Sequence, residues 1–430
     1  MATGRSALGL DEAGSSISSS RFRALRHRNF QLFVGGQLVS LCGTWVQNTA
    51  QLWLIYKLTG SAALLGIFGF MNQIPMLLLS SVGGYVGDRY SRHRGVIATQ
   101  VVSMLLALLL AALTLAHMIN GRRGAWVVIV VGLFQGIVNA FDVPIRQSFF
   151  VNMVGKPDLP NAIALNSSIF NGARVIGPAI AGFAIALIGE GWCFFANGLS
   201  FLAVIVALLA MRITPQEEMT ETRSAWQSLL QGFRFAMGDR VIRSVLILLS
   251  MLSFFGLQYM VFMPIFARDV LHGGARGLGL LMSASGIGAV LGALQFAART
   301  SYKGMLKWVG TMFLITSGGL IAFSQSRWFW ASAVLLFIFG FAATSQMAAT
   351  NTTVQNRVPD ELRGRVMAVY ATMFMGVQPI GSLVAGGLAK RFGAPATVAA
   401  FGAICLLGSL IYFWRAIPWA RSVRTVEAKT

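Results

Sequence analysis

The chain is constrained above all by long apolar runs that recur along its length, separated by short polar segments. Each run is long enough to cross the ~30 Å hydrocarbon core of a bilayer as an α-helix. Only 11% of the 430 residues are charged, against about 25% in soluble domains. The sequence therefore predicts an all-α polytopic membrane protein with 12 transmembrane helices, near residues 29–56, 61–87, 95–118, 125–153, 161–189, 191–211, 241–267, 277–298, 305–325, 328–355, 365–389 and 394–415.

The positive charges indicate how these helices are oriented. An even number of spans places both termini on one side. With the termini and the even-numbered loops on the cytoplasmic side, that side holds 24 Lys and Arg residues and the other holds 8. The positive-inside rule then predicts cytoplasmic termini in a multi-pass protein of the bacterial inner membrane. The net charge of +20 is scattered between apolar runs rather than gathered on one soluble face, so we expect no nucleic-acid partner.

The longest polar loop divides the spans six and six. It predicts a cytoplasmic tail (1–28), a first six-helix bundle (29–211), a linker (212–240), a second bundle (241–415) and a second tail (416–430). In the linker, apolar residues recur at helical spacing and favour an amphipathic helix on the inner membrane surface. They are Trp226, Leu229, Leu230, Phe233 and Met237.

The two halves also repeat each other. Pro157-Asp158 recurs as Pro359-Asp360, and Pro178 as Pro379, about 200 residues later. A weak repeat of this kind indicates two pseudo-symmetric bundles with a pathway between them.

A charged motif joins the second and third spans, and it resembles the signature loop of the major facilitator superfamily. It reads Gly84-x-x-x-Asp88-Arg89-x-x-Arg92-x-Arg94. The resemblance implies a twelve-helix transporter whose halves rock about a central site. Asp88 could then meet the positive N-terminus of span eleven, near Arg363 and Arg365, and close the inner face. These seven residues are the predicted conformational gate; alternatively, the arginines only anchor a short inner loop.

Span five carries Gly177-Pro178-x-x-x-Gly182, which resembles the glycine and proline motif of proton-coupled exporters in this superfamily. A plain helix-packing seam explains the motif equally well. Three further segments, 144–149, 158–178 and 359–370, resemble the branch that contains the enterobactin exporter and bacterial macrolide-efflux proteins. That resemblance implies export of a bulky organic molecule.

Three charged residues fall well inside predicted spans, away from their ends: Asp142, Arg146 and Arg174. At 1.5 Å per residue, Asp142 and Arg174 lie about 18 Å and 20 Å from the inner face, and Arg146 follows Asp142 by one turn. A charge at the bilayer centre costs at least ~2.5 kcal/mol, so such residues usually mark a pathway or a relay. Asp142, paired with either arginine or both, could carry a proton. Alternatively, Arg174 or Arg146 binds an anionic group of the substrate and releases Asp142, or the charges form a structural ion pair.

Further polar residues within spans are candidates for a substrate cavity, because the resemblance implies that spans one, four, seven and ten line it. Interhelical hydrogen bonds explain any single one equally well. The candidates are Gln37, Thr44, Asn48 and Gln51 in span one, Asn72 and Gln73 in span two, Gln258 and Tyr259 in span seven, and Gln346 and Asn351 in span ten.

Together these features favour a secondary active exporter of a hydrophobic or amphiphilic compound, drug-like or siderophore-like. We expect proton antiport by rocker-switch alternating access, in a monomer. An uncoupled facilitator or importer of the same fold, or a non-transporting membrane sensor, remain alternatives. Gly155-Lys156 is followed by Pro157 and forms no Walker motif, so ATP is not the direct energy source. We expect no cofactor, no metal site and no enzymatic activity, because the Cys and His residues are dispersed.

Overall fold

The computed structural model describes residues 23–212, 225–299 and 304–427, and every regular element in these ranges is helical. The side chains of Asp88, 225–228 and 416–427 are not part of the description. Most of the predicted N-terminal tail, linker residues 213–224 and the last three residues therefore lie outside the described residues.

The first half contains five long helices: α2 (Arg28–Thr59), α3 (Ala62–Arg89), α4 (Arg92–Leu115), α5 (Gly121–Ile188) and α6 (Glu190–Leu209), preceded by the short η1 (Arg23–Arg26). Helix α5 has 68 residues and contains two spans, because Gly155 (φ 74°, ψ 171°) interrupts its helical backbone. Few residues other than glycine adopt such a φ. The predicted spans four and five are thus the two limbs of α5.

The second half repeats this order with more interruptions. The linker helix α7 (Ala225–Gly238) leads into span seven, which consists of α8 (Arg240–Phe254), η2 (Gly256–Gln258), α9 (Tyr259–Ile265) and the π-helical η3 (Phe266–Val270). There follow α10 (Gly274–Ala297), α11 (Met305–Gln325) and α12 (Phe329–Arg357). Span eleven comprises α13 (Asp360–Ala371), the π-helical η4 (Thr372–Gly376) and α14 (Gln378–Phe392), and α15 (Ala394–Glu427) is the last helix.

Ten stretches of the described chain are long and apolar enough to cross a membrane. The stretch Gly121–Ile188 contains two spans, and α2 is not among the ten because polar residues interrupt its apolar sequence. The described chain therefore holds twelve spans, and the predicted all-α polytopic fold in two six-helix bundles is confirmed.

Glycines with positive φ lie at five of the turns at one end of the molecule, which we call the glycine end. They are Gly60, Gly121, Gly189, Gly274 and Gly393. Gly189 (φ 82°, ψ 171°) and Gly393 (φ 85°, ψ 156°) join spans five to six and eleven to twelve with nearly the same backbone conformation. This match is independent support for a structural repeat. The other end, with the turns at Arg89–Arg92 and Arg357–Asp360, is called the basic end.

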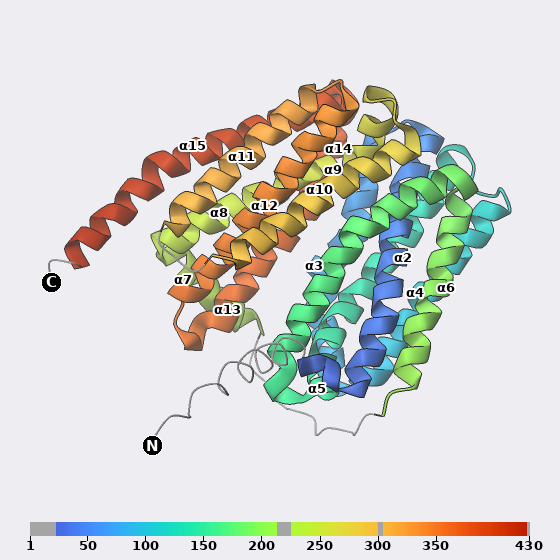
Figure 1. Ribbon diagram of the computed structural model, residues 1–430, viewed down its shortest axis with the longest axis horizontal. Helices are drawn as coiled ribbons and strands as arrows, with labels where there is room; N and C mark the ends of the chain where they lie inside the picture. The colour runs from blue at the N-terminus through green and yellow to red at the C-terminus, as the bar shows by residue number, and fades with distance from the viewer. Residues whose placement is uncertain (1–22, 213–224, 300–303, 428–430) are drawn as a thin grey trace, which may run out of the picture.

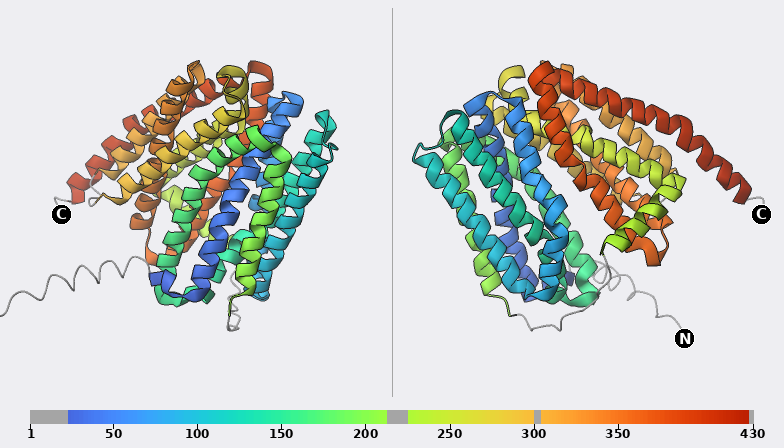
Figure 2. Two further views of the ribbon diagram at one scale, coloured as in Figure 1. Left: turned by 45° about the vertical axis from the view of Figure 1, so that its right-hand side comes forward. Right: turned by 180° about the vertical axis from the view of Figure 1, so that it is seen from behind.

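Two helix pairs make the most extensive contacts between the halves: α5 packs against α10, and α3 packs against α14. A Cβ atom on Gly182 would lie 2.8 Å from Cα of Gly279, and one on Gly66 would lie 2.6 Å from Cα of Gly386. These two seams are therefore backbone against backbone. Both lie toward the glycine end, and the halves diverge toward the basic end (Figures 1 and 2).

Helix α7 is present as predicted from its apolar spacing, and it packs on α13 through small residues. Gly232 and Ala236 are buried, and Gly232 packs against the backbone carbonyl of Arg365 on α13. Leu230 and Phe233, which were expected on the membrane-facing stripe, are 43% and 45% exposed. The small residues allow α7 to approach α13 and leave the larger ones on the outside. Trp226 lies outside the described side chains.

The seams lead to a first prediction. Replacing Gly182 with leucine should lower the apparent Tm of the detergent-purified protein by several degrees, because overpacking costs about 1–3 kcal/mol. Gly172→Leu on the same helix is the control, since no atom lies within 4 Å of a Cβ built there. Equal Tm changes for the two variants would contradict a tight seam.

Candidate functional site

Arg174 lies where the contact between the halves begins. The next residue, Val175, accepts a hydrogen bond from Ser283 of α10 at 3.0 Å, and its Cα would lie 3.0 Å from a Cβ on Gly286. From there to Gly182, α5 is in contact with α10. Arg174 itself is half-buried. It therefore occupies the edge of the seam that faces the basic end.

Both halves contribute to a small cavity around Arg174. Its lining residues are Trp45 of α2, Arg174 and Pro178 of α5, Tyr259 and Met260 of α9, and Met282, Ser285 and Gly286 of α10. The Tyr259 hydroxyl and the Ser285 hydroxyl share a hydrogen bond of 2.7 Å. Within the described residues Arg174 has no ion pair with an acidic side chain. A guanidinium group among aromatic and methionine side chains suits an amphiphilic anion.

Asp142 is held in a different place, between α4 and α5. Its carboxylate accepts hydrogen bonds from Thr99 at 2.6 Å and Gln100 at 2.9 Å, and it pairs with Arg146 at 3.1 Å. Only 4% of the residue is exposed. Of the pairings considered from sequence, the structure contains the one with Arg146.

Arg174 is not part of this network, so Asp142 does not neutralise it in this structure. Depth along a helix does not determine which way a side chain points. Asp142 and Arg146 are on the first limb of α5, where Thr99 and Gln100 of α4 contact the carboxylate. Arg174 is on the second limb, beyond the interruption at Gly155, beside α9 and α10. Of the alternatives that the sequence left open, this conformation contains the pair of Asp142 with Arg146, and Arg174 lies apart from it.

Several of the predicted gate side chains that the structure describes are engaged close to their own helix. Arg89 donates to the Tyr85 hydroxyl at 2.8 Å, and Arg92 lies 3.5 Å from the Ser148 carbonyl oxygen. Arg94 is exposed. The side chain of Asp88 lies outside the described part of the structure.

In the second half, Arg363 pairs with Asp360 and Arg365 donates to Gln231. Arg89 and Arg363 are thus engaged within their own half, and Arg365 is engaged by the linker helix α7. This agrees with the divergence of the halves at the basic end. A Cβ atom on Gly84 would have no atom within 4 Å, so close packing does not require glycine at this position. The nearby Gly83 and Gly87 are the glycines that pack on α5.

Sequence reasoning missed a contact between the halves near the glycine end. The Tyr56 hydroxyl of α2 donates a hydrogen bond to the Asp269 carboxylate of η3. The guanidinium carbon of Arg268 lies 5.8 Å from the centre of the Tyr56 ring. The only signal in the sequence was an Arg-Asp pair at the end of a span, which is too common to single out.

The polar cavity candidates fall into three groups. Several are already hydrogen-bonded to backbone groups: Thr44 to Ser40, Asn72 to Gly132, and Gln258 to Ser253 and Gln378. Others are at most 3% exposed with a side-chain atom that lacks a partner, namely Gln37, Gln51 and Gln346. Gln73, Asn48 and Asn351 are half-buried, and Tyr259 lines the Arg174 cavity. Of all the polar cavity candidates, only Tyr259 lines the cavity around Arg174.

The glycine and proline motif of span five makes close contacts on two sides. Gly177 packs against Trp45 of α2, whereas Pro178 and Gly182 face Gly279 of α10. The motif therefore places Trp45 and the second half next to Arg174. These contacts are those of a helix-packing seam, and they also form part of the cavity wall around Arg174.

Comparisons with known proteins identify the family. Residues 19–429 match the family model described as a transmembrane secretion effector of the major facilitator type. The chain belongs to the major facilitator superfamily. It is consequently a membrane transporter and not an enzyme.

Curated relatives are similar over most of their length. The chain is 27% identical to a staphyloferrin A transporter of Staphylococcus aureus, covering 89% of this chain and 95% of the relative. It is 25% identical to the multidrug efflux pump Tap of Mycolicibacterium fortuitum (89% and 94% covered). It is 23% identical to the enterobactin exporter EntS of Shigella boydii (90% and 91% covered).

Solved structures share the fold. A bacterial homologue of the lysosomal transporter Spinster, in an inward-facing unoccupied conformation, gives a TM-score of 0.69 at 14% identity, covering 90% of this chain and 96% of that chain. A bacterial homologue of ferroportin in an inward-facing state gives 0.66 at 15% identity, with 90% and 98% covered.

The contact of Tyr56 with Asp269 leads to a second prediction. Tyr56→Phe should raise the labelling rate by maleimide of a cysteine placed at Ala275, beside Gly182 in the seam, in a background without the native cysteines. A hydrogen bond to a charged group contributes ~1.5–3 kcal/mol, so the open population should rise by about tenfold or more. Tyr85→Phe at the basic end is the control. An unchanged labelling rate would show that the contact does not hold the seam closed.

Proposed function

We propose that this chain is a secondary active exporter of an amphiphilic organic compound that carries an anionic group, of the siderophore-like or drug-like kind. The observation that carries the proposal is Arg174, a cation without an acidic partner in the described residues, in a cavity to which both halves contribute. The relatives named for enterobactin export and for multidrug efflux support the export direction and the substrate class.

The arrangement of the halves supports alternating access. They are joined near the glycine end and diverge toward the basic end (Figure 1). The excess of Lys and Arg assigns the basic end to the cytoplasm of the bacterial inner membrane. A compound would then reach Arg174 from the cytoplasm or the inner leaflet. To open the glycine end, the protein must separate Gly66 from Gly386 and Gly182 from Gly279, and break the contact of Tyr56 with Asp269.

The cavity holds only about 10 Å³ in this conformation, room for one water, so a bulky compound binds only once the halves have moved further apart. The side chains of its walls suit the proposed substrate class. Trp45 and Tyr259 offer aromatic faces, and Met260 and Met282 offer flexible apolar ones. Methionine adapts to ligands of different shape, which suits a bulky amphiphile. Since one chain supplies both sides of the site, a monomer is sufficient for transport.

Proton coupling is a separate part of the proposal, and it rests on Asp142. Within the described part of the chain this carboxylate is buried in a span and engaged by three side chains, Thr99, Gln100 and Arg146. Thr99 and Gln100 are on α4 and Arg146 is on α5, so a change in the charge of Asp142 would alter the contact between these helices. We propose that protonation of Asp142 releases Arg146 and so favours one orientation of the halves.

The substrate site leads to a third prediction. In a thermal-shift screen of purified protein against iron-free siderophores and macrolides, compounds that stabilise the wild type should bind Arg174→Gln about tenfold or more weakly, because a hydrogen bond to a charged group is lost. Arg174→Lys should bind with intermediate affinity. Arg122→Gln, at an exposed arginine of the other end, is the control. Unchanged binding by Arg174→Gln would exclude the assigned site.

Coupling leads to a fourth prediction. Asp142→Asn keeps the shape of the side chain and removes its charge, so accumulation driven by a pH gradient in inverted vesicles should be lost. Exchange of substrate across proteoliposomes without a gradient should continue. Glu190→Gln is the matched control, because it removes another buried carboxylate, which pairs with Lys57 at 2.9 Å. Gradient-driven uptake at the wild-type rate in Asp142→Asn would contradict the role of Asp142, and a wild type indifferent to the gradient would favour a facilitator.

A further inference from the structure

A second cavity lies in the second half alone, at the basic end. It is a groove of about 410 Å³ between α8 and α15, bordered by α11 at Leu306. This is within the size range of small-molecule sites. Helices α8, α11 and α15 lie on the side of the second half that is turned away from the first half (Figure 1). The groove is thus separate from the Arg174 cavity.

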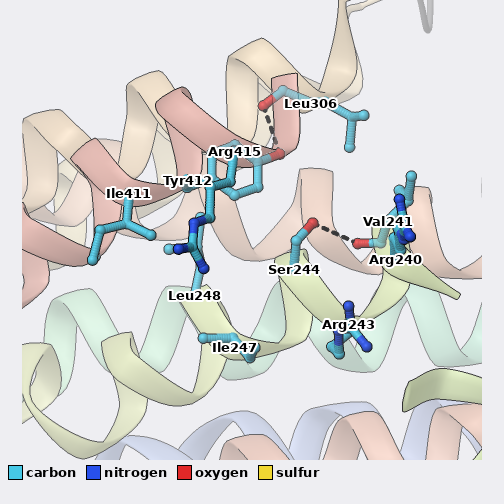
Figure 3. A pocket seen from close by; sticks show the side chains of 11 residues that line it. Arg240, Val241, Arg243, Ser244, Ile247, Leu248, Leu306, Ile411, Tyr412 and Arg415 are labelled. Carbon is cyan, nitrogen blue, oxygen red and sulfur yellow. Dashed lines mark hydrogen bonds between the residues drawn. The ribbon is translucent and has the colours of Figure 1, made fainter. Parts of the chain in front are cut away.

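The groove combines charge and an apolar surface. Arg240 and Arg243 come from the first turn of α8, and Arg415 comes from α15, so the two helices bring arginines to the same groove (Figure 3). Ile247 and Ile411 line it as well, and both are 46% exposed. On a membrane protein such exposed aliphatic side chains lie against acyl chains.

No acidic residue is among the described residues that line this groove. The acid nearest in sequence, Asp239, is already engaged. Its carboxylate accepts hydrogen bonds from the backbone nitrogens of Val241 and Ile242 at 2.8 Å and 2.9 Å, and pairs with Arg357 at 2.7 Å. The described lining of the groove therefore contains three arginines and no acid.

The depth of the groove matches the headgroup region. Trp414, next to Arg415, is 73% exposed, and exposed tryptophans favour the membrane interface. One wall of the groove is held in place, because the Tyr412 hydroxyl donates a hydrogen bond to the Leu306 carbonyl at 3.0 Å (Figure 3). Arginines at the membrane interface suit the ionic headgroup of a lipid, and the aliphatic side chains next to them suit its acyl chain.

We infer that this groove binds one anionic phospholipid, with its phosphate at Arg240, Arg243 and Arg415 and an acyl chain along Ile247 and Ile411. Guanidinium groups form paired hydrogen bonds with phosphate oxygens, and basic pockets between transmembrane helices bind acidic headgroups. The bound lipid connects the first helix of the second half to its last. The inference does not depend on the transported compound or on proton coupling.

Native mass spectrometry and thermal shift test this inference on the full chain in detergent. Dioleoyl phosphatidylglycerol should bind and stabilise the wild type, and dioleoyl phosphatidylcholine should do so much less. Arg243→Gln/Arg415→Gln should bind phosphatidylglycerol about fivefold more weakly for each arginine removed. Arg122→Gln/Arg123→Gln removes the same charge at the glycine end and should bind as the wild type does.

Two further arms separate the alternatives. Because Arg243 also donates to the Met237 carbonyl at 3.1 Å, the single variant Arg415→Gln is measured in parallel; it should weaken binding about fivefold even if the double variant does not fold. Glycerol phosphate, which has no acyl chain, should give no thermal shift. Equal stabilisation by glycerol phosphate, equal binding of phosphatidylcholine, or undiminished phosphatidylglycerol binding in Arg415→Gln would overturn the inference.

Discussion

Close approach of helix backbones is the constraint on which the rest of this structure depends. Lipid tails are as apolar as the helices, so the halves are not pressed together by the hydrophobic effect and must associate through packing and a few polar contacts. Gly66 with Gly386 and Gly182 with Gly279 provide that packing, and Tyr56 with Asp269 provides a polar contact. Around these glycines, buried apolar side chains of both halves form one continuous cluster. Separation of the seam therefore also requires these side chains to part.

The functional importance of Arg174 comes from its position at this contact between the halves. A buried arginine within one bundle would be expected to pair with an acid, as Arg146 does with Asp142. Arg174 instead lies at the edge of the contact between the halves, beside Trp45 of one and Tyr259 of the other. A ligand bound there would touch both halves and could favour one orientation over another through its different contacts in each.

The sequence predicted the fold well because its strongest signals are local. Apolar length determines the spans, and Pro157-Asp158 with Pro359-Asp360 indicates the repeat. The site was predicted less well, because it depends on which way side chains point. Depth placed Asp142 and Arg174 together, whereas the two limbs of α5 direct them to different neighbours. Asn72 and Gln258 looked like cavity residues, yet their amides bond backbone groups of neighbouring segments. Tyr56 gave no signal, since its importance comes from a partner 213 residues away.

The central claim is that the transported compound binds between the halves at Arg174. A cryo-electron microscopy structure of the protein with a stabilising siderophore or macrolide tests it most directly. The account predicts density for the compound between Trp45 and Tyr259, with an anionic group at the guanidinium of Arg174. Density at another place, with Arg174 paired to an acidic side chain of the protein, would contradict it.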